Sequence, residues 1–406
     1  MKYARVSFLI FLLLKPFYIF GSGGLQFADI FLILSAIIAL SLLFLNRHSS
    51  SSAKGVIRDN RFFVIFTFLA IAINVCYFVT LGKTSFLLSS SYLVFNLVAV
   101  ILFSYLSRDK SFLSRISSIF EMHLVIQTII FLLGIGRMYD ETRYMGTMND
   151  PNQFGFFVFI TFLYIYVIRH WLNARSTRTL LALVLSLFLI ALSGSTGMIL
   201  GIGFFVVAIL CYAFLQIGRT RYSTIQRIAY VCSITVTSFI FIIMPAWSLV
   251  RGESPVGEVL SEQVIIERIS SKASSGGTTN GLTFWEDRGY DKLYLYPQYI
   301  LFGAGQGEYS RFVKAAMPLE VHATLPAILF VYGFIPCSIL IIWIYRRLKD
   351  APVYAKVALI ALIVESFTLL NQRQSLFWMF IVLIGTVSCA ATLPDKNLPG
   401  KEAICD

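Results

Sequence analysis

Glu320 and His322 stand two positions apart late in the chain, and both could accept a proton. An imidazole titrates near neutral pH, which suits His322 to general-base work, and the carboxylate of Glu320 could serve the same purpose. A structural histidine at the start of a helix is the alternative. The run GAGQG, residues 303–307, comes just before them. No strand is expected ahead of this run, so we interpret it as a turn and not as a nucleotide-binding loop.

Arginine also suits phosphate chemistry, because its planar guanidinium can donate to two oxygens at once. Five arginines lie in segments that we expect at one face of the membrane: Arg137, Arg143, Arg251, Arg288 and Arg373. Each of them alone fits a membrane-interface anchor or a solvated side chain. Two or three of them around one cavity could bind a diphosphate.

The run MNDPNQFGFF, residues 148–157, has the pattern of a helix start. Asn and Asp are common helix caps, and Pro151 suits the first helical position. The simplest interpretation is a helix cap at a membrane face. The alternative is an anion site, because a helix N-terminus attracts groups such as a diphosphate. Asn149, Asp150 and Asn152 are therefore candidate ligands.

The composition predicts that membrane helices position these residues. Hydrophobic residues make up 57% of the 406 residues and charged residues 13%, and the mean hydropathy is +0.78. A soluble domain carries about 25% charged residues. The apolar runs approach the ~20 residues that a helix needs to cross a bilayer, and they lack the alternation of strands. These features favour an all-α polytopic membrane protein.

We expect about twelve membrane-spanning helices, with ends uncertain by a few residues. They cover residues 6–20, 28–45, 62–81, 86–106, 116–134, 153–168, 180–192, 196–215, 228–250, 321–345, 353–370 and 376–393. Residues 1–250 would hold the first nine spans, 251–320 a long loop, 321–393 the last three spans, and 394–406 a tail.

Basic residues predict the orientation of these spans. With both termini in the cytoplasm, every inside loop is basic, and most of the outside basic residues fall in the long loop, where the positive-inside rule counts least. The net charge of +12 therefore reflects topology, and we expect no nucleic-acid partner.

The long loop, residues 251–320, has the pattern of a folded cap. Helical spacing of apolar residues predicts a short helix over 259–269, and a second short helix is expected within 281–300. Residues 274–281, SSGGTTNG, are typical of a flexible joint. The loop holds none of the six cysteines, so no disulfide framework is expected there. No metal-spaced cluster of Cys and His occurs either.

Three stretches together resemble the superfamily of O-antigen polymerases (Wzy) and O-antigen ligases (WaaL). They are NDPNQFG at a span start, SGSTG between two spans, and LFGAGQGEYSRF followed by EVHATLPAILFVYGFIP. By this resemblance, His322 matches the ligase histidine, Arg288 the arginine of the long loop, and Lys83 a basic residue of an early periplasmic loop. Ala323, Pro336 and Thr196 depart from the ligase pattern, which favours the polymerase branch.

The resemblance implies a GT-C-like glycosyltransferase of the bacterial inner membrane, with the long loop in the periplasm. Its donor and acceptor would be glycans linked to undecaprenyl diphosphate, and a chain-length regulator would be a partner beside the membrane lipids. His322 or Glu320 would deprotonate the acceptor, and the arginines would neutralise the diphosphate. We expect no cofactor and no metal.

Three alternatives remain open at this stage. An O-antigen ligase would transfer the finished glycan to lipid A-core. A polysaccharide flippase or solute transporter would also fit twelve spans, but the halves show no repeat and few ionisable residues lie within the spans. A receptor or structural membrane protein is the third.

Overall fold

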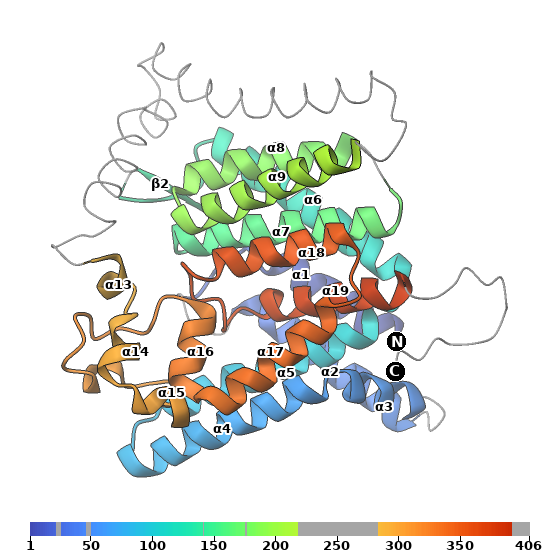
Figure 1. Ribbon diagram of the computed structural model, residues 1–406. Coiled ribbons are helices and arrows are strands. Elements are labelled where there is room, and N and C mark those ends of the chain that lie inside the picture. The colour runs from blue at the N-terminus through green and yellow to red at the C-terminus, as the bar shows by residue number, and fades with distance from the viewer. Residues whose placement is uncertain (22–25, 46–49, 141, 175–176, 218–282, 392–406) are drawn as a thin grey trace. The chain divides into compact units, whose positions relative to one another are not determined.

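The computed structural model describes residues 1–21, 26–45, 50–140, 142–174, 177–217 and 283–391 (Figure 1). Before the long gap the elements are α1 (Lys2–Leu14), α2 (Phe27–Leu45), α3 (Ser50–Asp59), α4 (Arg61–Leu81), α5 (Ser85–Leu106), α6 (Lys110–Leu132), β1 (Arg137–Tyr139), β2 (Arg143–Gly146), α7 (Pro151–Trp171), α8 (Thr177–Ser193) and α9 (Thr196–Ile217). After it come α13 (Phe284–Asp287), α14 (Asp291–Leu295), α15 (Gln298–Phe302), the 3-10 helix η2 (Tyr309–Arg311), α16 (Thr324–Tyr332), α17 (Phe334–Leu348), α18 (Val353–Glu365) and α19 (Ser375–Ala391).

The described residues are mostly helical, as the sequence predicts for a membrane protein. Within them, α4, α5, α6 and α7 are long and apolar enough to cross a membrane. Shorter apolar helices of 10–17 residues lie within α2, α8, α9 and α19. Long apolar helices satisfy their own backbone hydrogen bonds, which is the requirement for a segment in lipid. The expected span 228–250, the expected helix 259–269 and the joint 274–281 lie outside the described residues.

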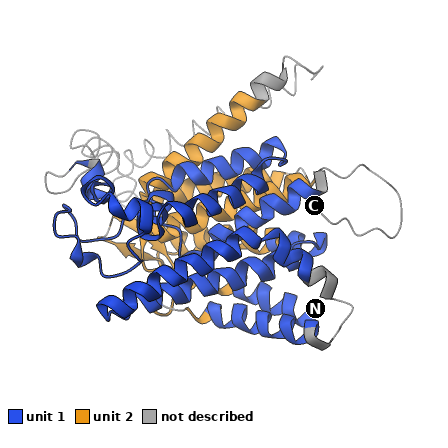
Figure 2. Cartoon of the chain, turned by 60° about the horizontal axis from the view of Figure 1, so that its bottom comes forward, with its two compact units in different colours: residues 1–12, 28–116, 278–406 blue, residues 13–27, 117–277 orange. Residues whose placement is uncertain are grey.

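The chain divides into two compact units, which we describe separately (Figure 2). Unit 1 comprises residues 1–12, 28–116 and 278–406. In it α4 packs against α5 and α17, α19 packs against α5 and α17, and α16 contacts α4, α15 and α17. The rings of Phe63, Phe66, Trp343 and Trp378 meet at the centre of this packing. Unit 1 therefore has an aromatic core inside a helix bundle.

Unit 2 comprises residues 13–27 and 117–277, and α7 is its central element. Helix α7 contacts α8, α9 and β2, and nearly all of its side chains are buried. An apolar helix without a polar face is what a position inside a bundle requires. Strands β1 and β2 pair antiparallel, with Met138 opposite Tyr144, and β2 contacts α7. This hairpin is the part of the fold that an all-α prediction misses.

Several helix boundaries differ from the sequence prediction, and α6, for example, begins at Lys110 and not at residue 116. The span expected over 321–345 is two helices, because Gly333 breaks it between α16 and α17 with φ 79° and ψ 178°. The helix in the first expected span, α1, ends at Leu14 and not at Phe20, because Lys15 precedes Pro16 and a residue before proline is disfavoured in a helix. The span expected to end at Leu370 stops at Glu365. In the cap, the single helix expected within 281–300 is the three short helices α13, α14 and α15.

The break after α16 depends on two glycines that lie against each other. Gly303 has φ 79° and ψ 149°, a region that is open almost only to glycine. A Cβ on Gly303 would lie 2.7 Å from the backbone of Tyr332, and a Cβ on Gly333 would lie 2.6 Å from the carbonyl oxygen of Leu301. The turn after α15 and the start of α17 can therefore lie this close to each other only because neither Gly303 nor Gly333 has a side chain.

We expect Gly303→Ala to destabilise unit 1 by at least about 1–3 kcal/mol, which is the cost of holding a residue other than glycine at these backbone angles. The measurement is the midpoint of thermal unfolding in detergent. Gly203→Ala is the matched control, because nothing lies within 4 Å of that position in α9. Equal midpoints for Gly303→Ala and Gly203→Ala would contradict the assigned role.

Candidate functional site

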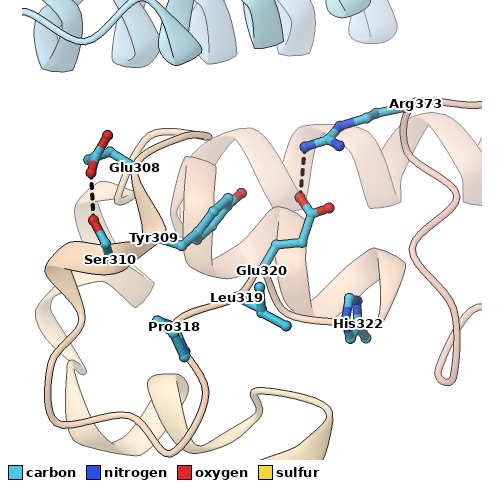
Figure 3. A pocket seen from close by; sticks show the side chains of 8 residues that line it. All are labelled: Glu308, Tyr309, Ser310, Pro318, Leu319, Glu320, His322 and Arg373. Atoms are coloured by element: carbon cyan, nitrogen blue, oxygen red, sulfur yellow. Dashed lines mark hydrogen bonds and ion pairs between the residues drawn. The ribbon is translucent and has the colours of Figure 1, made fainter. Parts of the chain in front are cut away.

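One pocket of unit 1 gathers the charged and titratable side chains that the sequence singles out after GAGQG (Figure 3). Its volume is about 420 Å³. The lining residues come from the end of the cap and from the α18–α19 connection: Glu308, Tyr309, Ser310, Pro318, Leu319, Glu320, His322 and Arg373. The pocket therefore brings together a carboxylate, an imidazole and a guanidinium.

Glu320 and Arg373 form an ion pair inside this pocket. Nη2 of Arg373 donates to Oε2 of Glu320 over 2.7 Å. Their side chains are 34% and 21% exposed, in the order Arg373, Glu320, so solvent screens the pair and a polar ligand could reach it. The guanidinium also lies 5.8 Å from the ring centroid of Tyr92. Arg373 is thus held in place but remains open to an anion.

The His322 imidazole has no hydrogen-bond partner among the described residues, although its backbone is held. Its N–H donates to the carbonyl of Arg288 over 2.9 Å. Burial lowers the pKa of the ring below its ordinary 6.5, and the nearby Glu320 opposes that shift. A lowered pKa keeps the imidazole neutral at pH 7, which is the form that accepts a proton.

Tyr309 is a pocket residue that the sequence analysis does not single out. Its side chain points toward the Glu320–Arg373 pair (Figure 3). The hydroxyl is buried and has no partner among the described residues. Burial raises the pKa of the phenol well above its ordinary value, so the hydroxyl stays protonated and can donate. One tyrosine among the 20 of this chain carries no pattern that would distinguish it.

The GAGQG turn fixes the chain that leads into the pocket. The N–H groups of Ala304 and Gly305 donate to the carbonyls of Phe330 and Val331, which are among the last of α16 and need partners outside the helix. Arg311 donates to the Ala304 carbonyl. These contacts tie the turn to α16, whose first residues follow His322.

The charged side chain of Arg311 has a structural role, because it packs against aromatic rings. Its guanidinium lies over a group of aromatic rings, at 4.7 Å from Tyr77, 4.7 Å from Phe312, 5.4 Å from Phe86 and 5.9 Å from Tyr299. Cation–π contacts of this kind stabilise a desolvated arginine. Arg311 therefore fastens the segment that follows the turn.

A buried pair in α14 holds the segment between η2 and Glu320. Asp291 and Lys292 are 1% and 0% exposed. Oδ2 of Asp291 accepts from the N–H of Ala316 over 2.7 Å, and Nζ of Lys292 donates to the Met317 carbonyl over 2.7 Å. Burial lowers the pKa of Lys292, and Asp291 opposes the shift. These two bonds attach the segment before Pro318, which lines the pocket, to α14.

We expect Lys292→Met to destabilise this segment by about 1–3 kcal/mol, because it leaves buried polar groups without a donor. Limited trypsin digestion at the exposed Lys314 should become faster. Lys349→Met is the matched control, since Lys349 and its neighbour Asp350 form a comparable pair with side chains 50% and 51% exposed. Unchanged cleavage at Lys314 in Lys292→Met would contradict the anchoring role.

Arg288 and Lys83 do not line the pocket. Nη1 of Arg288 donates to the Thr368 carbonyl over 2.8 Å, so its guanidinium links the cap to the α18–α19 connection. Its carbonyl holds His322, as described above. Lys83 is exposed between α4 and α5. Arg251 lies outside the described residues.

In unit 2 the polar residues before α7 mostly bind one another. The carboxylate of Asp150 caps α7 by accepting from the N–H groups of Asn152 and Gln153 over 2.8 and 2.9 Å. Arg143 donates to Oδ1 of Asn152 over 2.8 Å and to the Ser193 carbonyl over 2.9 Å.

Arg137 donates to Oδ1 of Asn149, whose amide donates to the Phe20 carbonyl over 2.7 Å. The helix-cap interpretation of this stretch is confirmed. The Asp150 carboxylate already occupies the positive N-terminal end of α7. The polar residues before α7 are therefore a poorer anion-binding site than the unit 1 pocket.

Comparisons with known proteins assign no family. No protein-family model matches the chain, and no curated protein matches it significantly. Within the described residues, no group of three or more His, Cys, Asp and Glu side chains could hold a metal ion.

Proposed function

We propose that this protein is a membrane glycosyltransferase that polymerises a surface polysaccharide such as O-antigen. It would join oligosaccharide repeat units that are carried on undecaprenyl diphosphate. The observation that carries the proposal is the pocket in which Glu320, His322 and Arg373 meet. A neutral imidazole and an accessible guanidinium are the base and the cation that such a transfer uses.

His322 is the group we assign as general base. Its ring has no hydrogen-bond partner among the described residues, whereas the Glu320 carboxylate already accepts from Arg373. The acceptor hydroxyl gives its proton to the imidazole while its oxygen forms a bond to the anomeric carbon of the donor. Glu320 then serves to hold Arg373 in the pocket.

Arg373 is the group we assign to the leaving diphosphate. As the bond between the anomeric carbon and the phosphate oxygen breaks, undecaprenyl diphosphate departs with the electron pair. A guanidinium placed beforehand stabilises this developing charge without reorganisation. The protonated hydroxyl of Tyr309, which points the same way, can donate to the diphosphate or to a sugar (Figure 3).

The proposal includes a location at the periplasmic face of the bacterial inner membrane, with both termini in the cytoplasm. The basic inside loops support this orientation. Nucleotide sugars are confined to the cytoplasm, so a transferase on the far side uses a lipid-linked donor. Membrane lipids and a chain-length regulator complete the proposed partners.

The pH dependence of transfer follows from His322. The pKa of His322 in the folded protein lies below the ordinary 6.5. The imidazole is therefore neutral at pH values above this lowered pKa, and it becomes protonated as the pH falls through the lowered pKa. Asp287, Arg288, Glu320 and Lys292 are the charged groups that act on the ring. We therefore expect the acid limb of the rate profile to have its midpoint below pH 6.5. A midpoint above 6.5, or an acid limb that persists in His322→Gln, would contradict the assignment.

Reconstitution tests the proposed function. The full chain in liposomes is incubated with the lipid-linked repeat unit, and the products are separated by size. A ladder of lengthened lipid-linked glycans supports a polymerase. Transfer to added lipid A-core would instead make the protein a ligase, and solute uptake without any glycan product would refute both.

A further inference from the structure

A second and much smaller space in unit 1 is also lined by Arg373. Its volume is about 10 Å³, and Asn96 of α5, Gln306 of the GAGQG turn, Gln372, Arg373 and Trp378 of α19 are among the residues that line it. The polar side chains here are deeply buried: Asn96 is 1%, Gln306 2% and Gln372 6% exposed. Three side-chain amides line this space together with aromatic and aliphatic side chains, whereas no side-chain amide lines the open pocket.

Several polar atoms around this space have no hydrogen-bond partner among the described residues. They are Oδ1 of Asn96, Nε2 of Gln306, both amide atoms of Gln372, and Nε of Arg373. Buried polar groups of this kind are normally satisfied by protein or by ordered water. Their gathering around one space indicates a ligand that both donates and accepts.

In the Asn96 and Gln306 amides the other atom of each group is fixed by a hydrogen bond, so their unpartnered atoms cannot turn away. Nδ2 of Asn96 donates to the Gln372 carbonyl over 2.9 Å, and that carbonyl also accepts from Nε1 of Trp378 over 2.9 Å. Oε1 of Gln306 accepts from the hydroxyl of Tyr332 over 2.5 Å. For Asn96 and Gln306 these bonds determine which amide atom is the oxygen and which is the nitrogen.

We propose that this space binds one ordered water molecule. A volume near 10–15 Å³ accommodates about one water, which needs two to four polar partners. The donors Nε2 of Gln306 and Nε of Arg373 match the two lone pairs of water, and the acceptor oxygens of Asn96 and Gln372 match its two protons, so one water pairs four of the five unpartnered atoms. The water connects the GAGQG turn to the guanidinium that holds Glu320. Asn96 and Gln306 are thereby positioning residues for Arg373, whatever reaction the pocket performs.

Radiolytic hydroxyl-radical labelling of the full chain in detergent tests the inference. Radicals formed from a bound water label the side chains beside it. Phe66 lines the space and Phe63 does not, yet both belong to α4 and both are 1% exposed. We expect Phe66 and Trp378 to be labelled and Phe63 to remain unlabelled. Equal labelling of Phe66 and Phe63 in the wild-type protein would overturn the proposal, and this comparison needs no variant.

Asn96→Leu, which is close in size, gives the second readout. Removing the acceptor should abolish the labelling of Phe66. It should also free the guanidinium, so that phenylglyoxal modifies Arg373 faster while Arg346 reacts as before. Persistent Phe66 labelling in a folded Asn96→Leu protein would refute the water site, and an unchanged Arg373 rate would refute the positioning role. Neither readout depends on glycosyl transfer, so the proposed function can fail while this inference stands.

Discussion

His322→Ala is expected to lower the rate of glycan extension by about 10²- to 10⁴-fold, the usual contribution of a general base. The imidazole is a proton acceptor in the pocket, its lowered pKa keeps it neutral at pH 7, and it has no competing hydrogen bond among the described residues. Its backbone stays held by Arg288 in the variant, so folding should persist. The measurement is the initial rate of product formation in proteoliposomes with equal amounts of protein.

Two further variants separate proton transfer from packing. His322→Gln keeps a polar side chain but cannot take a proton at neutral pH, and it should be as slow as His322→Ala. His170→Ala is the control, because that ring lies in α7 with Nδ1 3.0 Å from the Tyr166 carbonyl. Added imidazole should restore part of the activity of His322→Ala, since the pocket of about 420 Å³ has room for it. Full activity in both His322 variants would refute the assigned base.

Arg373→Ala is expected to lower turnover by about 10²- to 10³-fold, comparable to the loss of one group that stabilises transition-state charge. Arg373→Lys should recover only part of this loss, because an ammonium cannot donate to two phosphate oxygens in one plane. The effect should appear in kcat as well as in KM, since the charge on the diphosphate grows as its bond to the sugar breaks. Single-turnover rates of donor consumption are the measurement.

The control for Arg373 is Arg346→Ala. Both guanidiniums lie over an aromatic ring, Arg373 at 5.8 Å from Tyr92 and Arg346 at 5.3 Å from Phe62, but only Arg373 lines the pocket. Glu320→Gln tests the pair from its other side. Glu320→Gln removes the carboxylate and leaves the guanidinium, so it should lower turnover less than Arg373→Ala does. Equal rates in Arg373→Ala and Arg346→Ala would contradict the assignment of Arg373.

The sequence singles out Glu320 and His322, two of the eight residues that line the pocket, as a pair because they are close in the chain. Arg373 is different: it is one of five candidate arginines, and only tertiary packing selects it. The N–H of Thr324 donates to the Ser366 carbonyl over 2.7 Å, and the N–H of Asn371 donates to Oγ1 of Thr324 over 2.9 Å. These contacts bring the α18–α19 connection to the start of α16. No spacing rule reveals such a contact across more than 40 residues.

The helices were predictable where hydrophobicity alone decides them. The expected spans over 62–81 and 86–106 agree with α4 and α5 within a few residues. Prediction failed where one backbone position overrides the hydrophobic pattern, as at Gly333 inside the apolar run of α16 and α17. It also missed the hairpin of β1 and β2, whose strands of 3 and 4 residues are too short to show alternation.

The stoichiometry of donor release is the most direct measurement of the central claim. Proteoliposomes holding the full chain are supplied with a lipid-linked repeat unit that is labelled in both its sugar and its lipid. Glycosidic bonds formed and undecaprenyl diphosphate released are counted together over the same time course. We predict one undecaprenyl diphosphate for each bond, with both products formed about 10²- to 10⁴-fold more slowly by His322→Ala. Release without extension, extension without release, or no glycan product from the wild-type chain would contradict the account.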